Sequence, residues 1–247
     1  GQSDIEVTQP GRTWDHDTFE EANRRFKNAE EPFLGFIMTN QPHAPYPLPD
    51  HLPVSESWNR FPHDTRENRY LNALGYADWA LGQFFQKAKE EDYFNNTIFF
   101  VTSDHPQRKL QGPVDPPDLF HIPGFFIGPG VGPGVHRGIV SQLDIVPTIV
   151  EFADWGSPYA SFGRSIFDDS SKEPPGAICT LSNTMIRVEA GGWIHHSLRK
   201  RISSGTYQIG ADLDAIENRL LSVIQSSTTL YQSNRLCPPD FVPKNPR

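Results

Sequence analysis

Five residues with apolar or β-branched side chains, at positions 98–102, are followed directly by Ser103, Asp104 and His105. The five do not alternate with polar residues, which favours a strand buried on both faces, as in a parallel sheet covered by helices. Open α/β sheets bind ligands beyond the carboxyl ends of their strands, which is where Asp104 and His105 stand. A carboxylate beside an imidazole also offers two ligands for a divalent metal ion.

The segments before this strand have the rhythm of an α/β fold. An apolar stripe with three- and four-residue steps predicts a helix at residues 67–90, and a short turn then leads into the strand. A polar helix is expected at 20–29, with Asp17 or Thr18 as its N-cap. Residues 33–39 form a second continuous apolar run, which predicts another interior strand.

The loop after this second run contains four prolines between residues 40 and 49, which exclude both a helix and a central strand. It is therefore a stiff loop that carries His43 directly past a strand end. Farther along, residues 122–127 predict a strand with His121 at its start. His121 is a candidate for an additional metal ligand or for a residue that orients one.

The last part of the chain has a different character. We therefore expect two parts: residues 1–170 in an α/β domain with a mostly parallel sheet flanked by helices, and residues 171–247 in a small antiparallel extension. The expected elements are a helix at 145–153 with Asp144 as its N-cap, a hairpin at 177–180 and 184–188, strands at 192–198 and 206–209, and a helix at 211–234. His195 and His196 lie next to each other on a strand and so point to opposite faces, which disfavours a shared metal ion.

Composition removes several functional classes. The net charge of -8 argues against a nucleic-acid partner, because phosphate binding requires a basic surface. No run of about 18 apolar residues occurs, so no segment is expected to span a bilayer. Cys179 and Cys237 are the two cysteines, and the sequence leaves open whether they form a disulfide or remain thiols.

Several segments together resemble the sulfatase-like enzymes of the alkaline phosphatase superfamily, and above all the branch of bacterial lipoteichoic acid synthases and phosphoglycerol transferases. The segments that carry the resemblance are residues 76–85, 93–98, 103–105, 120–123, 141–149 and 163–167. The resemblance covers about residues 30 to 170. It implies the corresponding sulfatase-like fold.

The resemblance also implies roles for individual residues. Enzymes of this family use a Thr, Ser or modified Cys nucleophile at a divalent metal ion to take a phosphoryl or sulfuryl group from an ester. Asp104 and His105 match the Asp-His pair that ligates the metal. His43 matches a histidine that contacts the phosphate or sulfate of the substrate, and Arg108 matches an arginine suited to anionic oxygens.

This sequence departs from the family pattern in two respects. Pro106 stands where the family commonly has glycine, and proline fixes φ and removes an N–H. The family nucleophile and an acidic metal ligand belong to an N-terminal half that has no counterpart here. We therefore expect no catalytic nucleophile in this chain, which resembles the C-terminal portion of a larger enzyme and alone is expected to be inactive.

The resemblance predicts that the full-length protein is a metal-dependent hydrolase or phosphoglycerol transferase acting on an anionic ester, such as a phosphoglycerol lipid or glycan. It predicts an extracytoplasmic location, periplasmic or on the outer face of the bacterial inner membrane, with an anchor in N-terminal segments outside this chain. The sequence leaves open sulfate or phosphate as the ester and Mn, Zn, Mg or Ca as the metal.

Two other interpretations remain. A non-catalytic binding or regulatory domain could retain the same fold, and Pro106 together with the missing half favours this alternative. An unrelated metal hydrolase, such as a polysaccharide deacetylase, would need a second cluster such as two histidines separated by three residues, and no such spacing occurs.

Overall fold

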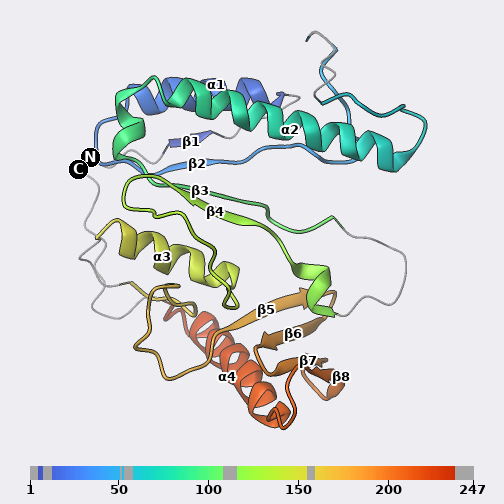
Figure 1. Ribbon diagram of the computed structural model, residues 1–247. Coiled ribbons are helices and arrows are strands. Elements are labelled where there is room, and N and C mark those ends of the chain that lie inside the picture. Colours follow the sequence, from blue (N-terminus) through green and yellow to red (C-terminus); the bar gives the residue numbers. More distant parts are fainter. Residues whose placement is uncertain are drawn as a thin grey trace. The chain divides into compact units, whose positions relative to one another are not determined.

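The computed structural model describes residues 5–7, 13–50, 52, 58–107, 116–154 and 159–236 (Figure 1). These residues form two compact units, and each is considered by itself. The first comprises the described residues up to Ile98 together with Gly128–Gly130. The second comprises the described residues of Phe99–Ile127 and those from Val131 onward. The predicted division at residue 170 stays a prediction.

The first unit is built on two packed helices that lie beside a pair of parallel strands (Figure 1). Its elements are β1 (Ile5–Val7), α1 (Asp15–Lys27), β2 (Gly35–Ile37), α2 (Arg66–Ala88) and a 3₁₀ helix (Asp92–Asn96). The rings of Phe19 and Phe84 join the two helices with centroids 5.3 Å apart. The helix is present as predicted, but its buried face differs from the predicted stripe: Ala73, Tyr76 and Ala80 on α2 are fully buried, whereas Leu74 of the stripe is 43% exposed.

The first helix begins earlier than the sequence predicts. We expect it to start at Glu20, but α1 starts at Asp15, and Trp14 rather than Asp17 or Thr18 is the N-cap. Thr18 lies inside the first turn, where its hydroxyl donates to the Trp14 carbonyl at 3.3 Å. Acidic residues in a first turn interact favourably with the helix dipole, so the early start has a local physical basis.

The second unit begins with an antiparallel strand pair, β3 (Phe99–Thr102) and β4 (Gly124–Ile127). A 3₁₀ helix (Pro116–Phe120) precedes β4, and a second one (Gln142–Asp144) leads into α3 (Ile145–Phe152). The rings of Phe100, Phe126 and Phe152 form a continuous row with centroids 4.5 and 5.2 Å apart. This row packs the strand pair against α3.

The C-terminal part of the second unit is a four-stranded antiparallel sheet with one helix on it. The elements are β5 (Gly176–Leu181), β6 (Thr184–Glu189), β7 (Gly192–His196), β8 (Arg201–Thr206) and α4 (Leu213–Gln232). Ile194, Ile216 and Leu220 form the buried core between the sheet and the helix. The predicted hairpin and final helix are confirmed.

The last strand is the main error in this part of the prediction. We expect it at residues 206–209, but β8 spans Arg201–Thr206 and pairs Arg201 with His196 and Thr206 with Gly192. A tight connection in which the Ser197 hydroxyl donates to the Lys200 carbonyl at 3.0 Å returns the chain earlier than expected. Serine and glycine in this strand hide it, because both have low strand propensity.

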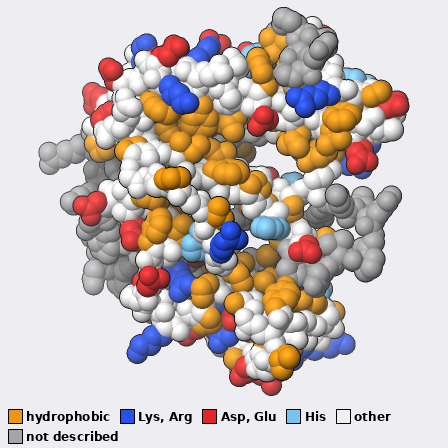
Figure 2. Space-filling model, viewed as in Figure 1, with side chains coloured by type: hydrophobic (Ala, Val, Ile, Leu, Met, Phe, Trp, Pro, Cys, Tyr) orange, Lys and Arg blue, Asp and Glu red, His pale blue; other side chains and the backbone are white. Residues whose placement is uncertain are grey.

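The mixed α/β class is confirmed, and the pairings refine the predicted mostly parallel sheet. Among the described strands β1 and β2 are the parallel pair, whereas the other pairings are antiparallel. Phe99, Phe100 and Val101 of β3 are half-buried and Thr102 is exposed, so the strand is not sealed on both faces. Figure 2 shows hydrophobic side chains at the surface in the region of α2 and β2, and Phe36 of β2 is 59% exposed.

Two further expectations concern the membrane and the cysteines. Within the described ranges, every helix is too short or too polar to cross a bilayer. Cys179 is a free thiol, and burial raises its pKa to about 11. Cys237 lies outside the described residues.

Candidate active site

The residues that follow β3 form an ordered corner. The Thr102 hydroxyl donates to the Pro123 carbonyl at 2.8 Å, which ties the end of β3 to the segment entering β4. The Gln142 side-chain amide donates to the Asp104 carbonyl at 2.9 Å. Gln142 is not among the predicted site residues, although it lies within the segment 141–149 that carries the family resemblance. These bonds fix the backbone of Asp104.

Asp104 and His105 are brought together as predicted. The His105 N–H donates to Asp104 Oδ1 at 2.8 Å, and His105 Nε2 lies 3.6 Å from Asp104 Oδ2. His105 Nδ1 lies 3.1 Å from the Pro106 carbonyl, which can only accept, so Nδ1 carries the proton. Nε2 then presents its lone pair on the side of the carboxylate. The Asp104 and His105 side chains are 85% and 72% exposed, so both are accessible.

This arrangement fits two ligands of one divalent ion. With metal–ligand bonds of about 2.1 Å, two tetrahedral ligand atoms are about 3.4 Å apart, close to the observed separation of 3.6 Å. Histidine ligands commonly donate their second ring N–H to a backbone carbonyl, as His105 does to Pro106. Proline at position 106 is therefore compatible with an oriented imidazole, because its carbonyl rather than an N–H does the orienting.

His121 lies in the segment between the 3₁₀ helix and β4, and its side chain is exposed. The ladder pairs Thr102 with Gly124, so the antiparallel register brings the segment of His121 to the end of the ladder at which Asp104 stands. Within the described residues, however, His, Cys, Asp and Glu side chains nowhere form a group of three or more that could hold a metal ion. The role of His121 stays a prediction.

His43 belongs to the first unit and lies on the proline-rich loop after β2. Its side chain is exposed, and Nδ1 lies 2.8 Å from the Ala44 carbonyl. By the same reasoning as for His105, Nδ1 is the donor, and Nε2 remains as an acceptor when neutral or a second donor when protonated. A protonated imidazole on an exposed loop suits contact with an anionic oxygen. Arg108, the other predicted anion contact, lies outside the described residues.

Two other polar positions have structural roles. Asp144 is buried, and its carboxylate accepts from the Ser141 N–H at 2.8 Å and the Arg164 N–H at 2.9 Å. Asp144 occupies the N-cap position of α3 as predicted, but its side chain makes no capping hydrogen bond to α3; it instead completes a capping box with Ser141, the N-cap of the preceding 3₁₀ helix. His195 and His196 face opposite sides of β7, as expected: His195 Nε2 contacts the Thr184 hydroxyl at 2.7 Å, whereas His196 is buried.

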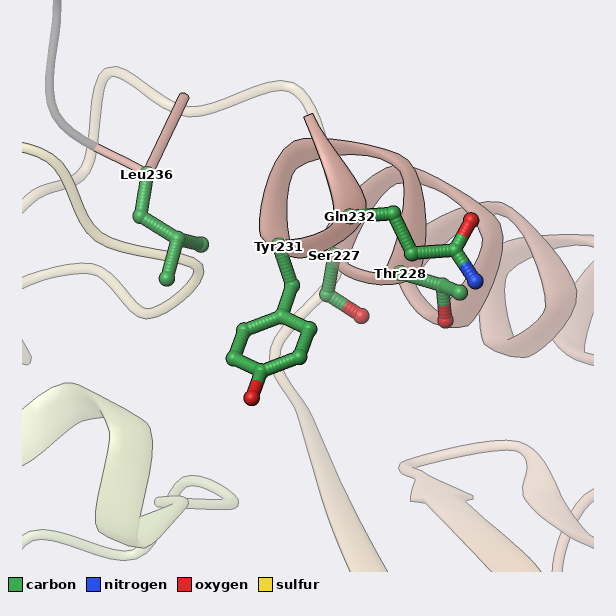
Figure 3. Close-up of a pocket in the computed structure, with 5 residues that line it drawn as sticks. All are labelled: Ser227, Thr228, Tyr231, Gln232 and Leu236. Atoms are coloured by element: carbon green, nitrogen blue, oxygen red, sulfur yellow. The ribbon is translucent and has the colours of Figure 1, made fainter. Parts of the chain in front are cut away.

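A shallow pocket of about 420 Å³ lies at the C-terminal end of α4, far along the chain from the residues just described. Figure 3 shows Tyr231 on the helix and Leu236 beyond its end, on facing sides of this hollow. The lining residues are Ser227, Thr228, Tyr231, Gln232 and Leu236. They include no carboxylate, imidazole or thiol, which are the side chains that most often ligate divalent metals.

Comparison with known proteins decides the family. A sequence-family model described as Sulfatase matches residues 2–155. The chain belongs to the sulfatase family. The lipoteichoic acid synthase of Staphylococcus aureus (strain USA300) is 26% identical over an alignment of 152 residues, and the match covers 56% of this sulfatase-family chain and 23% of that protein. The resemblance found in the sequence is confirmed.

Two solved structures share the fold. A protein in the alkaline phosphatase superfamily from Vibrio parahaemolyticus matches with a TM-score of 0.73 and 24% identity, over 93% of this chain and 58% of the other. A lipoteichoic acid synthase from Listeria monocytogenes matches with a TM-score of 0.63 and 20% identity, over 91% and 60%. The sulfatase-family chain thus spans less than two thirds of the relatives that it matches.

Proposed function

We propose that this chain supplies one part of the active site of a metal-dependent enzyme that cleaves or transfers a phosphate or sulfate ester. The observation that carries the proposal is the paired presentation of Asp104 Oδ2 and His105 Nε2, 3.6 Å apart and open to solvent at the end of β3, in a chain of the sulfatase family. The nucleophile and the remaining ligands belong to a portion of the protein outside this chain.

The residues of the chain have distinct tasks in this proposal. Asp104 and His105 hold a divalent ion, which when bound supplies positive charge for the transferring group and for activation of an oxygen nucleophile. Pro106 and Gln142 keep the two ligands in place through the contacts described above. His43 contacts an anionic oxygen of the substrate, and Arg108 is proposed to do the same.

For the substrate we favour a phosphate ester of the phosphoglycerol type. The support comes from the resemblance to the phosphoglycerol transferase branch and from the two matching lipoteichoic acid synthases. The net charge of -8 is consistent with a small anionic ester held at a localised cationic site rather than with a polyanion spread over the surface. An extracytoplasmic, membrane-anchored enzyme, with Mn, Zn, Mg or Ca as the metal, follows from the same resemblance.

The test is metal analysis and activity of the full-length protein that contains this chain. Loss of an outer hydrogen-bond partner of a metal-bound histidine typically costs about 10–100-fold in metal affinity, so Asp104→Ala and His105→Ala are expected to cost at least as much. His136→Ala and Asp169→Ala alter exposed residues of the same types in the same unit and serve as controls. Both controls are expected to retain the metal.

Activity is measured with p-nitrophenyl phosphate, p-nitrophenyl sulfate and phosphatidylglycerol vesicles, which separate the two ester classes. Unchanged metal content in both ligand variants would refute the assignment of Asp104 and His105. A protein that holds no metal and turns over none of the three substrates would instead favour the non-catalytic binding domain.

A further inference from the structure

A buried carboxylate lies at the start of α1. Asp15 is the first residue of the helix and only 1% exposed, although carboxylates are rarely buried without partners. The position at a helix N-terminus accounts for a negative charge, but it does not account for burial, since an exposed Asp would interact with the helix dipole as well. The partners of Asp15 come from elsewhere in the sequence.

These partners are two consecutive backbone N–H groups of the loop that follows β2. The Asn40 N–H donates to Asp15 Oδ1 at 2.9 Å, and the Gln41 N–H lies 3.3 Å from both carboxylate oxygens. Burial raises the pKa of Asp15, and the bonds from Asn40 and Gln41 only partly offset this effect. A costly buried group is therefore held at the entrance of the loop.

The same loop is fixed again five residues later. Tyr46 is buried, adopts a left-handed backbone conformation with φ 66°, and packs against the ring of Tyr70 on α2 with centroids 5.6 Å apart. Its N–H donates to the His43 carbonyl at 2.8 Å. His43 is thus an exposed residue between two buried attachment points.

The start of α1, where Asp15 lies, is held against α2 by side-chain contacts. The neighbouring His16 ring lies with Nδ1 2.7 Å from the Tyr76 hydroxyl, and Tyr76 on α2 is fully buried. The rings of Trp58 and Trp79 surround Tyr76 with centroids 5.6 and 5.9 Å away. The start of α1 is therefore locked to α2, so that a bond from Asp15 transmits a fixed position to the loop.

We propose that Asp15 is a positioning residue, whose buried carboxylate holds the loop through Asn40 and Gln41 so that His43 presents Nε2 to an anionic phosphate or sulfate oxygen. The inference rests on the proposed function of His43 and adds to it the group that sets its position. Asp15 itself does not contact the substrate.

A carboxylate is suited to this task because both of its oxygens accept. An alanine leaves both N–H groups without their acceptor, whereas an asparagine keeps Oδ1 but places an NH₂ group near the Gln41 N–H. The two substitutions therefore differ in how much of the attachment they retain. This difference gives a graded test.

The experiment uses the full-length protein with inorganic phosphate as the probe. Amide hydrogen exchange at Asn40 and Gln41 and the phosphate affinity are measured for Asp15→Ala, Asp15→Asn, His43→Ala and the double variant Asp15→Ala/His43→Ala. Glu20→Gln is the control, since Glu20 is an exposed residue of the same helix that pairs with Lys87 at 3.0 Å. Circular dichroism verifies that each variant is folded. If Asp15→Ala does not fold, the comparison is made with Asp15→Asn instead.

We expect faster exchange at both amides and about tenfold weaker phosphate binding in Asp15→Ala, with a smaller effect in Asp15→Asn and none in the control. In the His43→Ala background, Asp15→Ala is expected to weaken binding no further. An equal additional loss in that background would overturn the inference, because Asp15 would then act independently of His43. The inference would also be overturned if Asp15→Ala speeds exchange at both amides but leaves the phosphate affinity unaltered while His43→Ala weakens binding. If His43→Ala has no effect, the proposed function of His43 fails and the positioning role fails with it.

Discussion

The sheet that ends the chain contains a buried ion-pair cluster whose removal can be predicted quantitatively. Glu189 on β6 is 4% exposed, and its carboxylate accepts from Arg187 Nε at 2.6 Å and from Arg219 Nε and Nη2 at 2.7 and 2.6 Å. These are three charge-assisted hydrogen bonds at the edge of the core between the sheet and α4. We therefore expect Glu189→Gln to be strongly destabilising.

The magnitude follows from the exposure of the two arginines. Removal of one partner of a buried ion pair costs about 3–5 kcal/mol, since the other charge is left buried and unpaired. The Arg187 side chain is only 8% exposed, whereas that of Arg219 is 28% exposed and can turn outward. We expect the lower end of the range, about 3 kcal/mol, because only one of the two charges is trapped.

The assay is hydrogen exchange of the β6 amides, which reports the free energy of opening of this sheet. Asp214→Asn is the control, because the Asp214 side chain is 83% exposed and its pairing with Arg201 is worth at most about 1 kcal/mol. The double variant Arg187→Leu/Glu189→Leu is expected to recover most of the lost stability, since it removes the trapped charge together with its partner. A loss of less than about 1 kcal/mol in Glu189→Gln would refute the reasoning.

The pH dependence gives a second test of the same cluster. Burial disfavours the Glu189 carboxylate, but Arg219 and Arg187 more than offset this, so that the pKa of Glu189 lies below its ordinary value. A carboxyl group with a lowered pKa stabilises the folded state fully above its unfolded pKa of about 4.3, and this contribution is lost as the pH falls through the folded pKa. The difference in stability between wild type and Glu189→Gln is therefore expected to shrink on acidification below about pH 4.

Two further predictions concern local packing and reactivity. Gly176→Ala is expected to destabilise the C-terminal sheet by about 1–3 kcal/mol, because the added Cβ would lie 2.7 Å from Arg187 Nη2. Gly82→Ala is expected to stabilise α2 by about 0.5–1 kcal/mol, because the space around Gly82 is open. Thermal unfolding shows whether the stability falls in the first variant and rises in the second. Burial raises the pKa of Cys179 to about 11, so its alkylation by iodoacetamide at pH 8 is expected to be much slower in the folded than in the unfolded protein, and equal rates followed by mass spectrometry would contradict this.

Local patterns explain which elements could be predicted. The helix expected at residues 67–90 is observed at Arg66–Ala88, because an apolar stripe and an N-cap both mark it: the Thr65 hydroxyl accepts from the Asn68 N–H at 3.1 Å. The pairing direction of β3 could not be predicted, since an apolar run has the same appearance beside a parallel or an antiparallel neighbour.

In the candidate site, too, some residues could be predicted from the sequence and others could not. Asp104 and His105 are adjacent in sequence and follow a strand, so their juxtaposition could be predicted from the chain alone. The role inferred for Asp15 could not, because it depends on backbone N–H groups 25 and 26 residues away. In the sequence, an Asp at the start of a helix indicates no more than a favourable dipole interaction.

The exposed side of β2 shows what an apolar pattern does and does not determine. Gly35 faces α1, where an added Cβ would lie 2.4 Å from the Phe26 ring. Leu34, Phe36 and Met38 alternate with that face and are 63%, 59% and 63% exposed. The continuous apolar run at residues 33–39 predicts an interior strand. The strand is present as β2, but the exposure of Leu34, Phe36 and Met38 does not bear out its interior position. Burial further requires a layer that packs on the strand, and within the described part of the first unit α1 supplies one on the Gly35 side of β2. Side-chain chemistry is encoded within the strand itself, whereas burial is a property of whatever packs against it.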